Sequence, residues 1–214
     1  MPGPQRGSGR EQHDSRAALT RKRRRQQILD AATEVFASSG YHEAGINDVI
    51  ARAGIARGTF YLYFSSKHGV FTAILDDALV ELGARVAPVE IGRGARPPHD
   101  QLLDQVVAVV GYLLENRALT KLLLGPGLSP ADEVVEKLDA FSAHVLALLT
   151  ASLRHGISMG LVRECNTELV AAAILGALRG LIKHLLAVEN PPDLGAVARE
   201  LVEFALSGVS THPE

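Results

Sequence analysis

Residues 46–67 read INDVIARAGIARGTFYLYFSSK, and this stretch decides the fold of the N-terminal part of the chain. It contains two short helical segments, 47–53 and 57–63, with Gly54 between them. Glycine readily adopts the left-handed conformation that ends a helix. The packed apolar positions are Val49, Ile55 and Phe60. The pattern therefore predicts a helix-turn-helix, a motif whose second helix can enter a major groove.

The second segment carries the polar side chains that such a helix needs. Arg57 can bond guanine edges or phosphate, and the hydroxyl groups of Thr59, Tyr61 and Tyr63 suit phosphate oxygens. Lys67 adds a cation at the start of the next segment. These residue types favour contact with nucleic acid.

Charge is distributed unevenly along the 214 residues, whose formal net charge is −2. Residues 1–70 contain eleven Lys/Arg against six Asp/Glu, a net charge of +5. The remaining residues contain eleven against eighteen, a net charge of −7. A cationic N-terminal part favours a polyanionic partner, although the run from Arg16 to Arg25 is also consistent with a solubilising tail.

Composition indicates an all-α protein. Hydrophobic residues make up 47% of the chain and aromatic residues 5%, and the abundant Ala, Leu, Glu and Arg favour helices over strands. This apolar content can bury a sizeable core, which excludes fibrous and wholly disordered proteins. Cys165 has no partner for an internal disulfide, and no secretory signal follows the charged N-terminus, so we expect a cytoplasmic protein.

About nine helices are expected, in three parts of the chain. Residues 1–19 are expected to form a flexible basic tail, 20–66 a three-helix helix-turn-helix domain and 67–214 a helical body. The body would begin with a connecting helix, 67–87, which ends before Pro88. The other helices are expected at 26–40, 47–53, 57–63, 100–117 and 118–124, from Ser129-Pro130 to Gly160, and at 167–188 and 194–206.

The helix expected near 168–188 is almost apolar enough to span a membrane. Arg179, Lys183 and His184 would be costly in hydrocarbon, so we expect no membrane association and interpret the segment as a helix buried on two faces. Its small residues, which let another helix approach closely, are Ala172, Gly176 and Gly180. We expect this helix and the one near 194–207 to form a homodimer interface; burial within one chain is the alternative.

An ordered set of motifs extends over about residues 24–75. It consists of Gly40-Tyr41, Ile46-Asn47-Asp48-Val49, Ala53-Gly54-Ile55, Arg57-Gly58-Thr59-Phe60-Tyr61-Leu62-Tyr63-Phe64, Ser66-Lys67 and Phe71. This set resembles the TetR/AcrR family of bacterial transcriptional regulators. The resemblance implies a DNA-binding domain of three helices, a helical ligand-binding and dimerisation body, a homodimer through the last two helices, and repression relieved by a small molecule.

The resemblance also implies which residues contact DNA. Helix 57–63 would be the reading helix, with Tyr61 and Tyr63 on phosphates and base methyl groups and Lys67 as a phosphate anchor. The expected DNA-binding residues are Asn47, Arg57, Gly58, Thr59, Tyr61, Tyr63 and Lys67. Phe60 and Phe64 are core residues in the family. The run Arg21 to Arg25 is either an arm on the phosphate backbone or minor groove, or a solvated face.

Three positions depart from the family pattern. Gly45 replaces a threonine that caps the second helix and touches phosphate, so that hydroxyl group is lost. Ala56 replaces the usual Ser/Thr cap of the third helix, at a cost on the order of 1 kcal/mol of local helix stability. Ile50 replaces a small alanine, which predicts slightly wider packing of the second helix on the third.

An enzymatic alternative rests on Gly156-Ile157-Ser158-Met159-Gly160, which matches the G-x-S-x-G pattern of serine hydrolases. That motif requires a strand before the serine, whereas a long helix is expected here, so a helical hydrolase using Ser158 is disfavoured and we expect no enzyme. The eight histidines are scattered, without paired cysteines or an H-E-x-x-H motif. We therefore expect neither a metal nor a cofactor.

The body is expected to bind a hydrophobic or amphipathic effector in an apolar pocket. The candidate lining residues are Tyr112, Phe141, His144, Leu148, Arg179 and His184. His144 and His184 are interpreted first as core histidines, because each lies in an apolar helix. Arg179 would face an anionic group on the effector or an acid across the dimer, and we prefer the second.

These expectations combine into a mechanism. The reading helices of a dimer must lie about 34–36 Å apart to enter successive major grooves of a palindromic operator. An effector that binds a splayed state better by roughly 1–3 kcal/mol would shift the dimer off DNA through a tilt of the fourth helix. We expect effector to weaken operator binding without dissociating the dimer.

Overall fold

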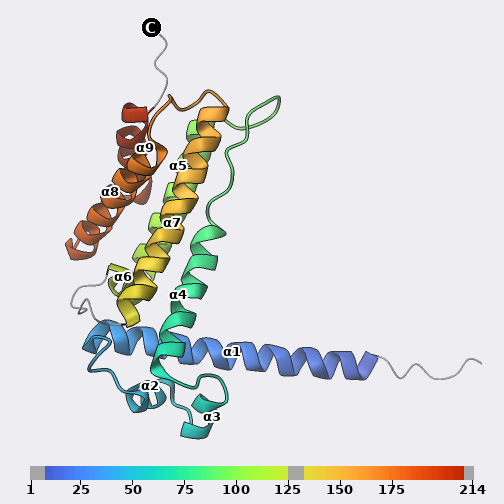
Figure 1. The fold of residues 1–214 in the computed structure, drawn as a ribbon. Coiled ribbons are helices and arrows are strands. Elements are labelled where there is room, and N and C mark those ends of the chain that lie inside the picture. The colour runs from blue at the N-terminus through green and yellow to red at the C-terminus, as the bar shows by residue number, and fades with distance from the viewer. Residues whose placement is uncertain (1–7, 125–132, 210–214) are drawn as a thin grey trace, which may run out of the picture. The chain divides into compact units, whose positions relative to one another are not determined.

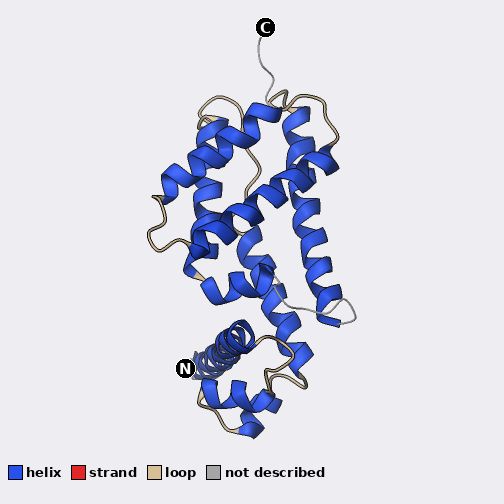
Figure 2. Cartoon of the chain, turned by 90° about the vertical axis from the view of Figure 1, so that its left-hand side faces the viewer, coloured by secondary structure: helices blue, strands red, loops and turns tan. Residues whose placement is uncertain are grey.

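The structure, a computed structural model, describes residues 8–124 and 133–209. Within these ranges the chain forms nine helices and no strand, which confirms the predicted all-α class (Figures 1 and 2). The helices are α1 (Ser8–Ser39), α2 (Ile46–Ala53), α3 (Arg57–Tyr61), α4 (Lys67–Gly83), α5 (Pro98–Glu115), α6 (Arg117–Leu124), α7 (Glu133–Ser158), α8 (Thr167–Ala187) and α9 (Leu194–Val209).

The chain divides into two compact units, Met1–Ile74 and Leu75–Glu214. The division falls inside α4, whereas the expected domain boundary lies at the start of that helix. One continuous helix therefore contributes residues to both units.

The N-terminal unit is built around the C-terminal half of α1, which packs against α2. Phe36, Phe60 and Phe71 have at most 2% of their surface exposed. The rings of Phe36 and Phe71 lie 6.2 Å apart between centroids, and Tyr41 meets both of them edge-on. Phe64 is also buried, as the family resemblance implies. These aromatic rings fix the helices of the unit against one another.

Helix α1 begins at Ser8, well before the expected start at Gln26. The prediction of a flexible tail over 1–19 is therefore wrong from Ser8 onward. Residues 16–27 consist mainly of Ala, Leu, Arg, Lys and Gln, which are strong helix formers, and glycine and proline are absent there. The side chain of Gln26 also donates to Asp30 one turn later, at 2.9 Å. Propensity alone extends the helix beyond the core that it packs on.

Two predicted helix ends differ slightly from the observed ends. Helix α3 ends at Tyr61 rather than Tyr63, with Leu62 as its C-cap. Helix α4 ends at Gly83, four residues before the expected end at Ala87. Glycine weakens a helix, and beyond it Arg85 donates hydrogen bonds to the carbonyl and carboxylate oxygens of Glu81, which closes the last turn.

In the C-terminal unit, α5 packs against α6, α8 and α9, and α7 packs against α8 (Figure 1). The buried cluster between α5, α8 and α9 consists of Val110, Leu113, Ile182, Leu185 and Val197. Asn166 caps α8: its Oδ1 accepts from the backbone N–H groups of Glu168 and Leu169 at 3.2 and 3.1 Å. The cap expected at Ser129-Pro130 lies outside the described residues.

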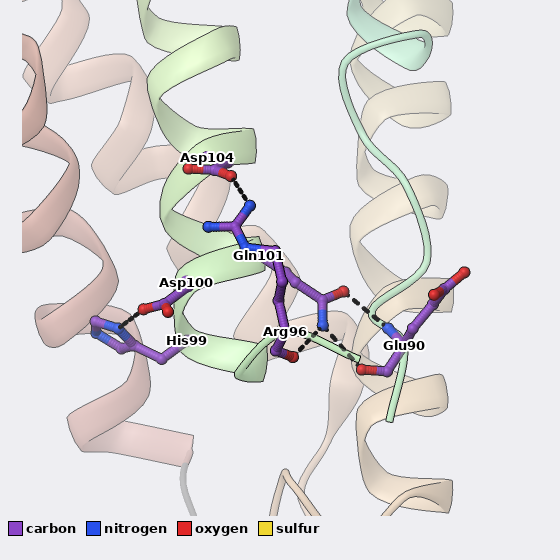
Figure 3. A network of polar contacts seen from close by, with 6 residues as sticks. All are labelled: Glu90, Arg96, His99, Asp100, Gln101 and Asp104. Carbon is purple, nitrogen blue, oxygen red and sulfur yellow. Dashed lines mark hydrogen bonds and ion pairs between the residues drawn. The ribbon is translucent and has the colours of Figure 1, made fainter. Parts of the chain in front are cut away.

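The loop between α4 and α5 is fastened by side chains from the first turns of α5 (Figure 3). Gln101 donates to the carbonyl oxygens of Glu90 and Arg96 at 2.8 and 2.7 Å and accepts from the Glu90 N–H at 2.9 Å. Arg96 pairs with Asp104, whose hydrogen bond and charge raise the pKa of the exposed guanidinium. This network fixes how the loop joins α5.

Helix α8 is long and apolar enough, by length and composition, to span a membrane. Within the chain, 17% of its most apolar window is buried. Within the chain α8 contacts α5 and α7, and Leu169 on α8 is 69% exposed. The alternative of burial within one chain is therefore wrong, and burial of the open face in a homodimer stays a prediction. An apolar face of α8 remains open.

Candidate DNA-binding surface

Helix α2 is held on α1 by polar contacts at its C-terminal end. Gln27 on α1 donates to the carbonyl oxygen of Ala53 at 2.6 Å, and Arg52 pairs with Glu34. At the N-terminus of α2, the Gly45 N–H donates to the carboxylate of Asp48 at 2.8 Å. Glycine has no side chain to return this bond, so Gly45 caps the helix without the hydroxyl group that the family usually has there.

The turn between α2 and α3 forms at Gly54, which has φ +61° in the left-handed region. Ala56, the N-cap of α3, makes no side-chain hydrogen bond. Phe60 is fully buried and anchors α3, while its neighbour Tyr61 is 45% exposed. The Arg57 guanidinium lies 5.8 Å from the centroid of the Tyr61 ring. Helix α3 thus buries one side chain and displays the cation and phenol beside it.

All seven predicted DNA-binding residues lie between the first turn of α2 and the first turn of α4 in the N-terminal unit. Four are exposed, namely Asn47, Arg57, Gly58 and Tyr61. Three are half-buried, namely Thr59, Tyr63 and Lys67. The structure therefore brings these residues together on α2, α3 and the segment that follows, and their contacts with DNA stay predictions.

Lys67 has an ordered set of partners within the N-terminal unit. Its Nζ donates to the backbone carbonyl oxygens of Tyr41, His42 and Ala44, at 2.7, 3.1 and 3.0 Å. It also lies 4.5 Å from the centroid of the Tyr41 ring. An ammonium group has three hydrogens, and all three are used here. A phosphate contact would require Lys67 to release one carbonyl, so its position favours a role in holding the loop between α1 and α2.

Leu62 is a surface feature that the sequence reasoning did not select. It follows Tyr61 directly and is 82% exposed. An apolar side chain on a reading surface can contact a thymine methyl group. Leu62 lies two residues after the buried Phe60, about 200° round the helix, so helical periodicity places it on the outer side.

The six predicted effector-binding residues are divided between core and surface. Phe141 on α7 is buried and Tyr112 on α5 is half-buried. The other four, His144, Leu148, Arg179 and His184, are exposed in the described chain. The interpretation of the two histidines as core residues is wrong, because both side chains are exposed in the part of the chain that the structure describes. Arg179 donates to the hydroxyl group of Ser142 on α7.

Tyr112 lies under a cation. The Arg85 guanidinium is 4.2 Å from the centroid of its ring, and Arg85 also pairs with Glu81. Burial raises the pKa of the Tyr112 phenol, Glu81 raises it further, and Arg85 opposes both effects. Tyr112 is therefore a neutral, half-buried group next to an ion pair at the end of α4.

The Gly156 to Gly160 segment does not have the geometry of a hydrolase elbow. Ser158 is the last residue of α7, a helix of 26 residues, and its hydroxyl group donates to the carbonyl oxygen of His155 at 2.7 Å. A nucleophile elbow requires a strand before the serine. Among the described residues, no group of three or more His, Cys, Asp and Glu side chains is placed to hold a metal ion.

The N-terminal unit contains a helix-turn-helix whose second helix, α3, carries exposed hydrogen-bond donors, and this part of the chain has excess positive charge. These features are typical of a DNA-binding protein. Residues 28–74 match the family model described as "Bacterial regulatory proteins, tetR family". The N-terminal part of the chain therefore matches the helix-turn-helix of TetR-type transcriptional regulators, and the predicted resemblance is confirmed for these residues.

The chain is also similar to named relatives and to solved structures. The "Fatty acid metabolism regulator protein" of Bacillus subtilis is 25% identical over 185 residues, 86% of this chain and 94% of its own. The "HTH-type transcriptional activator FasR" of Mycolicibacterium smegmatis is 46% identical over 57 residues, 27% of this chain and 26% of its own. The crystal structure of FadR from Bacillus subtilis in complex with stearoyl-CoA has TM-score 0.70 at 22% identity, and covers 87% of this chain and 99% of that one. The last similarity shows that the fold is shared over nearly the whole chain.

Proposed function

We propose that the protein is a homodimeric repressor that binds a palindromic operator in the bacterial cytoplasm and leaves it when a hydrophobic or amphipathic effector binds the body. The observation that carries this proposal is the display of Arg57 and Tyr61 on α3 while Phe60 beneath them is fully buried. Because Phe60 is buried, it fixes the orientation of α3. The polar side chains of α3 can then enter a groove without the cost of ordering the helix first.

The open face of α8 supports a dimer. At helical spacing along that face lie an exposed leucine and small residues, namely Leu169, Ala172, Ala173, Gly176 and Gly180. Helix α9 adds Phe204, which is 68% exposed. Small side chains allow helices to approach closely, and exposed large apolar side chains on adjacent helices are typical of an interface. We therefore place the interface on α8 and α9, near 168–188 and 194–207.

The chemistry of the effector is suggested by relatives. One relative is named for fatty acid metabolism, and a solved structure of the same fold holds stearoyl-CoA. A long-chain acyl thioester is amphipathic, and the half-buried Tyr112 is an aromatic side chain that could contact its acyl chain. Arg179, which donates to Ser142, is available to an anionic group at the surface. We propose an acyl-CoA as the first effector to test.

The central experiment is a mobility-shift titration on the DNA that flanks the gene of this protein. Wild type should bind, and Tyr61→Ala should bind at least tenfold more weakly, because the phenol and its support of Arg57 are lost. Ile91→Ala is the matched control: Ile91 is 52% exposed in the C-terminal unit, and the variant should bind like wild type. Equal binding by wild type and Tyr61→Ala would contradict the assigned reading helix.

A second experiment tests the dimer and the effector together. Light scattering should give a dimer for wild type and a monomer for Phe204→Glu, which places a charge on the proposed interface. Val80→Glu adds the same charge at a position that is 69% exposed on α4 and should remain dimeric. Stearoyl-CoA should release wild type from DNA and leave it dimeric; a monomer in its presence would contradict release by splaying.

A further inference from the structure

The N-terminal half of α1 forms a basic groove with the end of the helix-turn-helix. The groove is open, with a volume of ≈ 560 Å³, and its walls are Arg16, Ala17, Thr20 and Arg21 from α1 and Tyr63 from the segment after α3. Figure 1 shows this part of α1 continuing past α2 and α3 as a straight rod. A residue expected to contact phosphate, Tyr63, therefore shares a surface with two arginines from a distant part of the sequence.

Side-chain contacts link residues along this part of α1 to one another and to Phe64. The hydroxyl group of Thr20 donates to the carbonyl oxygen of Arg16 at 2.9 Å, and Arg24 donates to Gln27 at 2.8 Å. One turn beyond Arg21, the Arg25 guanidinium lies 5.9 Å from the centroid of the Phe64 ring, next to Tyr63 in sequence. This contact ties the basic helix to the end of the helix-turn-helix.

Negative charge is scarce along this part of α1. No Asp or Glu occurs between Asp14 and Asp30, an interval that contains five arginines and one lysine. The carboxylate of Asp30 itself accepts a hydrogen bond from Gln26. Arg16 and Arg21 are both exposed. A row of guanidinium groups with few carboxylates nearby carries net positive charge and attracts a polyanion. A guanidinium group can also bind a phosphate through two parallel hydrogen bonds.

We propose that the α1 groove, formed by Arg16, Thr20, Arg21 and Tyr63, binds backbone phosphates of duplex DNA just outside the half-site that α3 reads. The occupant is DNA because Tyr63 belongs to the segment that directly follows α3, the helix that carries Arg57 and Tyr61. Helix α1 then forms a second DNA-contacting surface besides α3, so each subunit covers a longer stretch of the duplex. This proposal rests on the proposed function, since it requires the protein to bind an operator.

The test compares neighbouring charges on opposite sides of α1. At 3.6 residues per turn, Arg16 and Arg21 flank Ala17 and Thr20 on the groove face, whereas Lys22 points to the far side of the helix. Arg16→Gln and Arg21→Gln remove a charge from the groove, and Lys22→Gln removes the same charge outside it. The probe is a duplex that wild-type protein selects from a random pool, titrated over a range of salt concentrations.

Each lost phosphate contact should reduce the magnitude of the slope of log affinity against log salt concentration by about 0.9 per subunit. For a dimer the reduction should be about 1.8. At about 0.15 M salt this corresponds to a loss of affinity of about 30-fold for Arg16→Gln or Arg21→Gln. Lys22→Gln should change neither value appreciably. Ethylation of phosphates flanking the half-site should interfere with binding of wild type and not of the Arg16→Gln/Arg21→Gln double variant.

The outcomes separate this proposal from the proposed function. If wild type selects no duplex, the proposed function itself fails. If wild type selects one and both groove variants keep its affinity and salt slope, the groove does not bind phosphate and the function stands. If Lys22→Gln flattens the slope as much as Arg21→Gln does, the effect is general charge screening and the groove proposal is overturned. Unchanged helical circular dichroism of each variant excludes a folding defect.

Discussion

Replacing Lys67 with methionine should destabilise the N-terminal unit, because Lys67 holds the loop between α1 and α2. The substitution keeps an unbranched side chain of similar length and removes the ammonium group that donates to the carbonyl oxygens of Tyr41, His42 and Ala44. The residues between α1 and α2 then lose their link to α4. Because Lys67 is half-buried, water can replace these bonds only in part.

The expected loss follows from the number of bonds. A typical hydrogen bond contributes about 0.5–1.5 kcal/mol net, so three bonds contribute about 2–4 kcal/mol. The contact of Nζ with the Tyr41 ring, at 4.5 Å, adds about 0.5–1 kcal/mol, which the retained methionine side chain partly offsets by packing. We expect the opening free energy of the N-terminal unit to fall by about 2–4 kcal/mol.

Hydrogen exchange read by mass spectrometry measures this quantity for each unit separately. Amides of α1 and α2 within residues 28–53 should exchange faster in Lys67→Met, whereas those of α5 and α8 should not change. Lys22→Met is the control, since Lys22 is exposed on α1 and its loss should stay within about 0.5 kcal/mol. If Lys67→Met leaves exchange unchanged but flattens the salt dependence of DNA binding by about 0.9 per subunit, Lys67 is a phosphate anchor and the reasoning is refuted.

Further predictions concern a turn, a cap and a buried phenol. Gly54→Ala forces an L side chain to φ +61°, and chemical denaturation should show a loss of about 1–2 kcal/mol; Gly83→Ala, at ordinary φ, should show none. Ala56→Ser supplies the missing cap of α3 and should gain about 0.5–1 kcal/mol; a loss in the same denaturation assay would show that the cap geometry is unsuitable. Burial, followed by Glu81, raises the pKa of Tyr112, so the folded state keeps this proton longer than the unfolded chain. The resulting stability is complete below pH about 10 and is lost as pH rises through the raised pKa. Tyr112→Phe should lack this decline, and identical unfolding curves for both proteins above pH 10 would contradict it.

The sequence predicted the elements whose signals are local. Gly54 ends α2 and Asn166 begins α8, because each acts through its own backbone conformation or through hydrogen bonds within three residues. Burial of Phe60 and Phe64 was implied by an ordered motif. The same local reasoning failed at the start of α1, where low hydrophobicity suggested a tail although helix propensity was high throughout.

Other properties depend on which segments meet. The exposure of His144 and His184 could not be read from their apolar helices, because hydrophobic periodicity does not say which of two faces a neighbour covers. The partners of Lys67 are three carbonyl groups more than twenty residues earlier, which no spacing rule connects to it. The pairing of Tyr63 with Arg16 and Arg21 has the same origin.

The sequence by itself determined that this chain is helical, where most helices begin and end, and that its N-terminal part carries a helix-turn-helix. Tertiary structure alone decided which charged side chains hold the fold and which face solvent, and which apolar face of α8 stays open. The physical reason is range: caps, turns and propensities act over a few residues, whereas burial and hydrogen bonds between distant segments are set only when the helices pack.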